Sequence, residues 1–417
     1  EGKYSIFVPK KGATLIFSFV GMKTKEVVCG DKREINVTLE EDVQAMEEVV
    51  VTGYQVIKEK ASTGAVSKVN MDDLILNGTQ TLEAALQGKV PGMMVINRSG
   101  LTGTRQRVRV RGTSTLLGNA DPVWVVDGVI QEDPLPFSTN DFNNLDPSNT
   151  DMINDFVGGA ISWLNPKDIE SITILKDGSA AAIYGSRAAN GVILVQTKKG
   201  KAGKVSISYD GYIDHDMVAN QPEVLSVDEF LAHERDVDFG HRVDWYDKLL
   251  NKSNLGQSHY LAVSGGGENL TFRASANYKK KDGLDIASSR KEYGVRMGFT
   301  AKTLEGLLEI QGNLSTRVIN EEYVDYGVFQ QAVKLNPTHP LMDEKDPSKY
   351  STLYGFDTYN PVGWLKDKED GGDRQFSLAD FKVKLNILPT LNTELSLARQ
   401  SQEYFKRIYV NSNHKES

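Results

Sequence analysis

The 417-residue sequence lacks three features that would each place it in a known class of protein. It contains one cysteine, Cys29, which excludes a disulfide within the chain and a cluster of thiolate metal ligands. No apolar run approaches the roughly 18 residues of a helical membrane span, although the alternating strands of a membrane β-barrel would escape this test. Basic residues (48) do not outnumber acidic ones (56), so nucleic-acid binding is not expected.

Patterns typical of catalysis are also absent. The six histidines show no close-spaced metal pattern such as HExxH, and there is no nucleophile elbow, Walker loop or dinucleotide fingerprint. The carboxylate-rich residues 367–373 lack EF-hand spacing, so a solvated loop is favoured over a calcium site. The sequence therefore predicts no enzyme activity, no catalytic residue, no metal site and no cofactor.

The first two zones of the chain are predicted to be a partial β-sandwich and a linker. In residues 1–43, apolar residues recur at every second position around 4–8, 15–19 and 35–39, with Val27 and Val28 between them. These three or four short strands predict half of a small β-sandwich. Residues 44–60 form a charged linker that contains the β-branched run Val49, Val50 and Val51. Such a run could add as a strand to the sheet edge of a partner, or be an ordinary edge strand of the flanking domain.

The third zone, residues 61–201, reads as a compact α/β domain. Short apolar runs bounded by glycine predict strands, and helical spacing predicts two short helices. The predicted strands lie at 108–110, 123–126, 169–175 and 192–195, and the predicted helices at 81–87 and 179–184.

The fourth zone, residues 202–417, alternates apolar and polar residues with period two, so each strand has one apolar and one polar face. About seven or eight strands are predicted, around 205–209, 259–264, 270–278, 293–299, 308–314, 381–387 and 395–397. Short and long connections alternate between these strands. Short turns at one end and long loops at the other are typical of an outer-membrane β-barrel and are not required in a soluble sandwich.

Two groups of side chains are candidates for function. Alternating arginines lie on one face of a predicted strand, where they form either a solvated or salt-bridged face or a contact with a polar barrel wall. They are Arg105, Arg107, Arg109 and Arg111. The longest loop is rich in aromatic residues, which suit stacking on sugars or gripping a peptide, but equally suit packing within the loop or against a partner protein. They are Tyr350, Tyr354, Phe356, Tyr359 and Trp364.

Several motifs resemble the SusC/RagA family of TonB-dependent outer-membrane transporters. Residues 47–54 (Glu47, Glu48, Val49, Val50, Val51, Thr52, Gly53, Tyr54) resemble its TonB box. Residues 84–92, 108–112 and 125–129 are similar to parts of its plug domain, and the long run 168–193, which includes Arg187, is the most specific match. Residues 1–43 are similar to the end of the carboxypeptidase-regulatory-like domain that often precedes the TonB box.

The resemblance implies a mainly β fold, in which an α/β plug domain (61–201) lies inside a transmembrane antiparallel β-barrel (202–417). It implies a multi-pass location in the outer membrane and active import of an oligosaccharide or an oligopeptide. The implied partners are TonB with ExbB/ExbD, a SusD-like lipoprotein and outer-membrane lipid. Residues 47–54 would bind TonB, and Arg107, Arg109, Arg111 and Arg187 would contact the barrel. Tyr350, Tyr354, Tyr359 and Trp364 are weaker candidates for ligand contact.

The family's barrel has about 22 strands, so we expect this chain to be a fragment that lacks material at both ends and cannot form a pore alone. It opens at Glu1 without a charged-then-apolar leader, so any export signal is expected to have been removed or never to have been present. Two other functions stay open: an outer-membrane receptor or signal-transducing module without a primary transport role, and a soluble β-rich binding protein.

Overall fold

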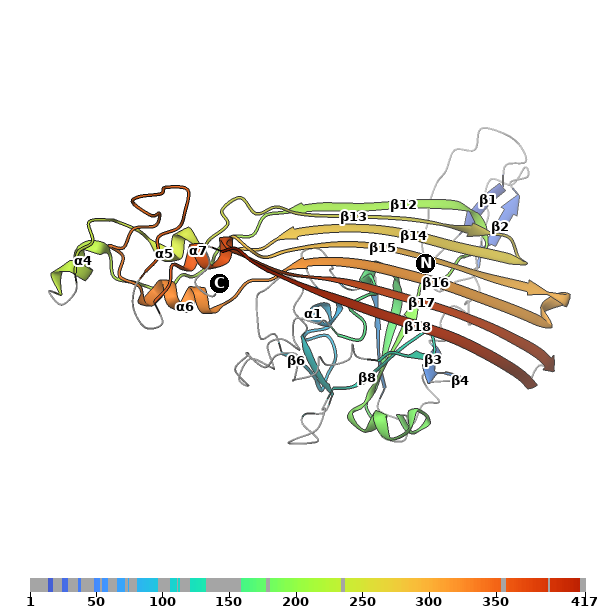
Figure 1. Ribbon diagram of the computed structural model, residues 1–417. Helices are drawn as coiled ribbons and strands as arrows, with labels where there is room; N and C mark the ends of the chain where they lie inside the picture. The colour runs from blue at the N-terminus through green and yellow to red at the C-terminus, as the bar shows by residue number, and fades with distance from the viewer. Residues whose placement is uncertain are drawn as a thin grey trace.

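The computed structural model contains a long antiparallel sheet and a smaller α/β domain that lies against one of its faces (Figure 1). It describes residues 14–17, 25–28, 37–38, 49–52, 55–58, 66–71, 74, 81–96, 106–110, 112, 121–132, 159–177, 181–233, 237–353, 358–388 and 391–412. No helix among these residues is long and apolar enough to cross a membrane.

The long sheet, which we call the wall, has seven strands in chain order, each antiparallel to the next. They are β12 (Gly203–Asp214), β13 (Gly256–Gly266), β14 (Leu270–Asp282), β15 (Ser289–Thr303), β16 (Leu308–Glu322), β17 (Lys368–Leu388) and β18 (Leu391–Val410). All seven strands predicted from alternation are present, and each is longer than its alternating stretch. The prediction of a solvated loop at 367–373 is wrong, because pairing with β18 begins at Lys368.

The connections between wall strands alternate in length, as predicted. Tight turns join β13 to β14, β15 to β16 and β17 to β18 at one end of the wall (Figure 1). The turn after β15 contains the 3₁₀ segment η7 (Leu304–Gly306), in which all three residues have positive φ, with values of 52°, 57° and 88°. The long connections lie at the other end and hold the helices α4 (Val227–Ala232), α5 (Trp245–Lys248), α6 (Gly327–Lys334) and α7 (Pro361–Lys366).

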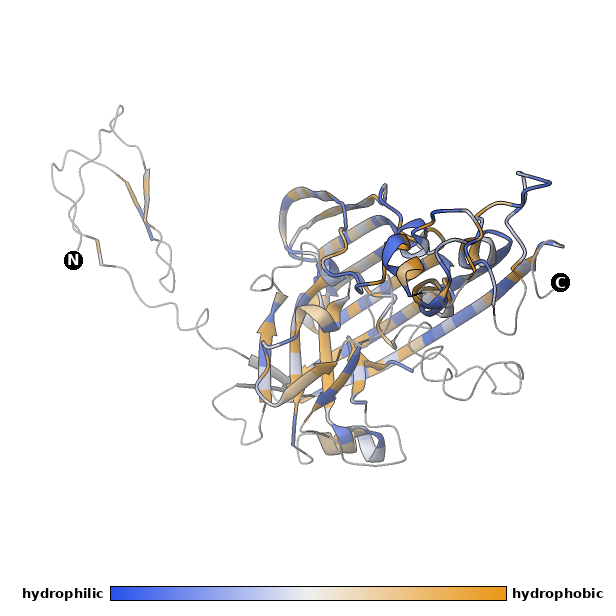
Figure 2. Ribbon diagram, turned by 90° about the vertical axis from the view of Figure 1, so that its left-hand side faces the viewer, coloured by the Kyte–Doolittle hydropathy of each residue, from blue (hydrophilic) through white to orange (hydrophobic). Residues whose placement is uncertain are grey.

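The two faces of the wall differ in chemistry. On β15, the side chains of Val295 and Met297 are 40% and 53% exposed, whereas Arg296 between them is 7% exposed and faces the α/β domain. Leu270 and Phe272 on β14 are also exposed. Figure 2 shows the resulting stripes of apolar and polar residues along the strands. The apolar face is therefore turned away from the α/β domain, as the sequence predicted.

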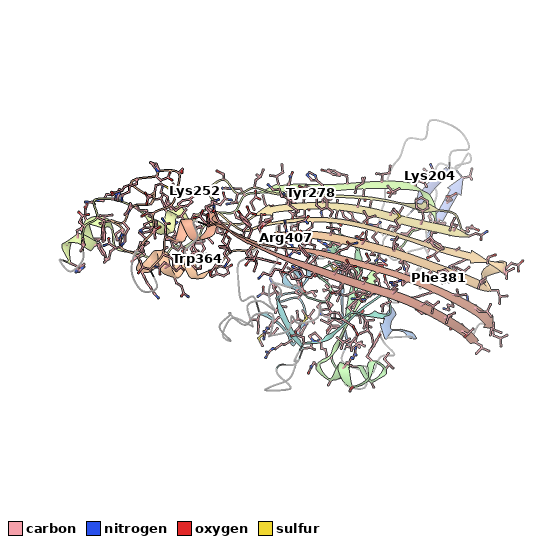
Figure 3. The ribbon with its side chains drawn as sticks, in the orientation of Figure 1. Lys204, Lys252, Tyr278, Trp364, Phe381 and Arg407 are labelled. Carbon is pink, nitrogen blue, oxygen red and sulfur yellow. The ribbon has the colours of Figure 1, made fainter. Side chains whose placement is uncertain are left out.

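Aromatic side chains form two rows across the apolar face. Near the loop end, His259, Tyr278 and Tyr293 lie side by side, with ring centroids 6.3 and 5.2 Å apart. Six residues along the strands toward the turn end, Phe272 pairs directly with Phe299. Figure 3 shows Tyr278 nearer the loop end and Phe381 nearer the turn end. Six residues of strand span roughly 20 Å, close to the roughly 25 Å of the apolar band that aromatic girdles flank in outer-membrane barrels.

The α/β domain is built on a five-stranded mixed sheet in the order β5-β10-β11-β8-β9. Its strands are β5 (Val66–Asn70), β8 (Val123–Val126), β9 (Val129–Ile130), β10 (Ile169–Leu175) and β11 (Val192–Thr197); only β8 and β11 pair in parallel. A separate hairpin joins β6 (Met93–Ile96) to β7 (Arg107–Val110). The four strands predicted in this zone are all present.

Two short helical segments were predicted in this domain. The first is α1 (Leu82–Ala85), which Thr81 caps by accepting a hydrogen bond from the Ala84 N–H. The second differs from the prediction, because the 3₁₀ segment η6 (Ala182–Asn190) runs past Gly185 instead of ending there. Gly185 has φ 71°, so it forms a kink between two helical turns. A third segment, η5 (Pro166–Asp168), leads into β10.

The hydrophobic core of the α/β domain includes two residues of the wall. Leu86, Ile169, Ile172 and Ile193 are fully buried within the domain. The same cluster contains Phe376 and Leu378 of β17, whose side chains face inward from the wall. The domain and the wall therefore share one core.

Two small hairpins are described in the N-terminal part of the chain. β1 (Thr14–Phe17) pairs with β2 (Lys25–Val28), and β3 (Val49–Thr52) pairs with β4 (Gln55–Lys58). Residues 37–38 have no strand geometry, so the strand predicted around them is not seen there. The strand predicted at residues 4–8 lies outside the described residues.

Candidate functional site: the contact between the α/β domain and the wall

Asp127 contacts the wall through its side chain and its carbonyl. It lies in the two-residue turn between β8 and β9, where Asp127 and Gly128 have φ of 49° and 87°, as a type I′ hairpin turn requires. Its Oδ2 accepts hydrogen bonds from Arg296 Nη2 of β15 at 3.0 Å and from Thr197 Oγ1 at 2.5 Å. The Thr197 N–H donates to Oδ1 at 3.0 Å, and Lys382 Nζ of β17 donates to the Asp127 carbonyl.

Asp168 makes a second contact, at the start of β10. The Tyr260 hydroxyl of β13 donates to Asp168 Oδ1 at 2.6 Å. Arg273 Nη2 of β14 donates to the Tyr260 oxygen at 2.8 Å and lies 3.9 Å from Asp168 Oδ1. Asp168 and Tyr260 are 4% and 5% exposed, so the contact is shielded from water.

Trp163 makes the third contact. Its ring stacks on Phe376 of β17 with centroids 4.3 Å apart and planes inclined by 10°. Its Nε1 donates to Gln131 Oε1 at 3.1 Å, and its carbonyl accepts a hydrogen bond from Arg317 Nη1 of β16 at 2.9 Å. The indole N–H and the carbonyl of Trp163 are therefore both paired, as buried polar groups require.

Arg317 belongs to a buried ion network on the inward face of β15, β16 and β17. Glu292 pairs with Arg290 and Arg317, and Glu321 pairs with Arg290 and Arg374. All five side chains are buried. The Tyr323 hydroxyl, at the base of the loop that follows β16, donates to Glu321 Oε2 at 3.0 Å. A buried network adds little net stability over apolar packing but is costly to break, so it fixes the geometry of the wall where Trp163 contacts it.

The residues predicted to contact the barrel are placed as follows. Arg107 and Arg109 lie on β7, in the hairpin with β6. Arg187, in η6, pairs with Glu132 of the same domain at 3.4 Å, with both side chains mostly exposed. Arg111, like Arg105, lies outside the described residues. The predicted role of these arginines is not tested and stays a prediction.

Of the predicted TonB box, Val49, Val50, Val51 and Thr52 form β3. Glu47, Glu48, Gly53 and Tyr54 lie outside the described residues. β3 pairs with β4 along one edge, with Val49 opposite Lys58 and Thr52 opposite Gln55. The segment is thus a strand, as either interpretation of the sequence requires.

The long connections of the wall pack together into a unit that we call the loop cap (residues 237–255, 283–288 and 323–367, except 354–357). Its core contains Trp245, Leu249, Val328, Val362 and Leu365. Burial lowers the pKa of His339, whose ring stacks on Phe239 with centroids 4.1 Å apart.

Three of the aromatic residues predicted to contact ligand pack against the core of the loop cap. They are Tyr350, Tyr359 and Trp364. The rings of Tyr359 and Trp364 are 4.4 Å apart, and Trp364 Nε1 donates to Asp325 Oδ2 at 3.0 Å. Tyr354 and Phe356 lie outside the described residues. Packing within the loop was one of the alternatives drawn from the sequence, and ligand contact stays a prediction.

Sequence reasoning missed Asp127, Asp168 and Trp163 as contact residues. The run 125–129 was recognised only as a strand, although an Asp-Gly pair between two apolar runs indicates a tight turn that exposes a carboxylate. No local signal identifies the partners on the wall. Among the described residues, no group of three or more His, Cys, Asp or Glu side chains is placed to hold a metal ion.

The α/β domain matches a known protein family. Residues 58–192 match the family model of the TonB-dependent Receptor Plug Domain. The α/β domain therefore matches the plug domain of TonB-dependent receptors, and we call it the plug below.

Two curated proteins are similar in sequence to most of this chain. The chain is a homologue of the TonB-dependent receptor SusC of Bacteroides thetaiotaomicron, with 29% identity over 94% of this chain and 40% of SusC. It is 31% identical to TonB-dependent receptor P26 of Formosa agariphila, over 87% of this chain and 36% of P26. The chain therefore spans about two fifths of the length of these curated relatives.

Solved structures show the same fold. The RagAB peptide importer in its open-open state matches with a TM-score of 0.70 and 22% identity, over 86% of this chain and 42% of that one. Its closed-closed state matches with a TM-score of 0.67. The named relatives are receptors and importers and not enzymes.

Proposed function

We propose that the chain is part of an outer-membrane importer that takes up an oligomeric nutrient, an oligosaccharide or an oligopeptide, with energy delivered by TonB. The observation that carries this proposal is the position of the plug. It lies on the polar face of a wall whose opposite face is apolar and exposed. That arrangement suits a barrel with lipid outside and a plugged aqueous interior.

The proposed mechanism begins with ligand captured at the loop cap, where Tyr350, Tyr359 and Trp364 are candidate contacts. Tyr354 is a further candidate from the sequence. Differential binding would shift residues 47–54 toward a released state. TonB, working with ExbB/ExbD, would then add a strand along β3 and pull on the plug. A SusD-like surface lipoprotein would share the ligand. The relatives support this proposal, because one is named a TonB-dependent receptor and another a peptide importer.

Uptake in living cells tests the function. With the whole protein in its host, labelled oligosaccharides and oligopeptides are offered to cells with and without TonB. We expect one class to accumulate only when TonB is present, and to bind at the surface in both strains. Accumulation without TonB would contradict the proposal. Binding that changes transcription without accumulation would favour the signalling alternative.

The orientation of the wall can be tested with a single charge. Met297 lies on the exposed apolar face between the two aromatic rows, so Met297→Arg would place a cation in the lipid. We expect Met297→Arg to make the free energy of folding into lipid vesicles about 2–4 kcal/mol less favourable. Met297→Leu should leave this free energy almost unchanged. Equal stability of the two variants in a urea titration would show that this face does not meet hydrocarbon.

A further inference from the structure

A small pocket lies where the chain passes from the plug into the wall. Residues 198–200 connect β11 to β12 and form one side of the pocket, and the inward faces of β14, β15 and β16 form the other. None of the three contacts described above fills it, although it adjoins the Asp127 contact through Arg296.

The lining of the pocket is cationic. Four of its side chains are basic (Lys198, Lys199, Arg273 and Arg296), and no carboxylate lines it among the described residues. Two carboxylates lie nearby on the wall, but Asp380 accepts the amide N–H of Asn313 and Glu309 accepts that of Gln311. No described hydrogen bond joins either carboxylate to a cation of the pocket.

Two of these cations are incompletely balanced. Arg296 is paired with Asp127, but Arg273 lies 3.9 Å from Asp168, with the Tyr260 hydroxyl as its hydrogen-bond partner. The Arg273 Nε is a buried donor with no hydrogen-bond acceptor in the described part of the chain. Lys199 Nζ donates at 3.1 Å to Gln311 Oε1, which is neutral. Lys199 is exposed, so solvent screens its charge, whereas Arg273 is largely shielded and keeps a buried Nε donor that an anion would satisfy.

The pocket has room for about one water-sized particle. A monatomic anion fits this space better than a tetrahedral oxyanion such as phosphate, because it needs a smaller movement of the flexible lysine side chains. We propose that the pocket binds a small inorganic anion of the size of chloride. The anion accepts charge-assisted hydrogen bonds from Lys199 Nζ and Arg273 Nε. It thereby holds the connection between β11 and β12, which we call the β11–β12 linker, against the wall.

The first test uses bromide as the probe. Crystals of the whole protein are grown or soaked in sodium bromide, and anomalous scattering locates the ions. We expect a bromide within hydrogen-bond distance of Lys199 Nζ and Arg273 Nε. A pocket without bromide, when other sites are occupied, would overturn the proposal.

The second test measures stability in detergent as chloride replaces gluconate at constant ionic strength, because gluconate is too large for the pocket. We expect chloride to raise the unfolding midpoint of the parent protein by about 2 °C or more, since a bound anion stabilises the folded state. Lys199→Met should lose this response. Lys201→Met is the matched control, because it removes the same charge from an exposed lysine of the β11–β12 linker that does not line the pocket.

The results of the two tests distinguish a specific anion site from general screening and from an adventitious ion. A chloride response that disappears in Lys199→Met and persists in Lys201→Met supports the site. An equal response in all three proteins indicates general screening and contradicts it. Bromide in the crystal without any chloride response indicates an adventitious ion only. None of these measurements depends on transport, so the site can fail while the proposed function stands.

Discussion

Val50→Pro is expected to abolish TonB-dependent accumulation of ligand while leaving surface binding intact. β3 is the segment proposed to pair with TonB, and strand addition requires backbone N–H donors in an extended conformation. Proline removes one donor and fixes φ near −65°, which strand pairing does not tolerate within a ladder. Uptake and binding of the same labelled ligand, compared in one strain, measure the two effects separately.

The control for this change is Val50→Thr, which keeps the N–H and the β-branched shape and should leave uptake near the parent level. One edge of β3 is already occupied by β4. A partner must therefore use the other edge of β3 or displace β4. Full uptake by the proline variant would show that the segment does not transmit force by strand pairing.

Asp127→Ala is expected to loosen the plug from the wall. The substitution leaves Arg296 buried without its counter-charge and removes the acceptor for both the hydroxyl and the N–H of Thr197. Removing one partner of a buried ion pair typically costs about 3–5 kcal/mol. We expect the midpoint of urea unfolding in detergent to fall accordingly, and the plug to become sensitive to protease before the wall does.

Asp127→Asn provides a graded comparison, because it keeps one of the two acceptor oxygens while it loses the charge and the other acceptor. Its cost should be smaller, about 1–3 kcal/mol. Glu170→Ala is the matched control, since this carboxylate also belongs to the plug but is exposed, on β10. If Asp127→Ala unfolds at the same urea concentration as Glu170→Ala, the Asp127 contact does not hold the plug.

The wall could be predicted from the sequence because its environment acts on every second residue. Apolar and polar residues must alternate along a strand that separates an apolar from a polar medium, so stretches such as 293–299 can be recognised as strands from the sequence. The strand ends could not be predicted in this way. The first residues of β17 are charged or glycine on both faces, so the alternation that reveals the strand begins only near Phe376. These residues form a strand because they pair with the neighbouring strands, and the local sequence does not indicate that pairing.

The contact site was less predictable than the fold. Asp127 and Arg296 are 169 residues apart in the chain, and the sequence contains many other arginines that could serve equally well. The arginines of β7 could be selected as candidates because they alternate within a short stretch of sequence. The arginines described at the interface are spread over β14, β15, β16 and β17, one or two on each strand, and only the folded sheet brings them to one face.

The shared core has a consequence for the order of assembly. Phe376 and Leu378 complete the cluster that contains the plug residues Ile172 and Ile193, and Phe376 covers the ring of Trp163. Until β17 is laid down, one end of that cluster remains open to water and the indole lacks its partner. The domain that is synthesised first therefore reaches its final packing only after a strand that leaves the ribosome much later, and a plug produced on its own should behave as a loosely packed intermediate.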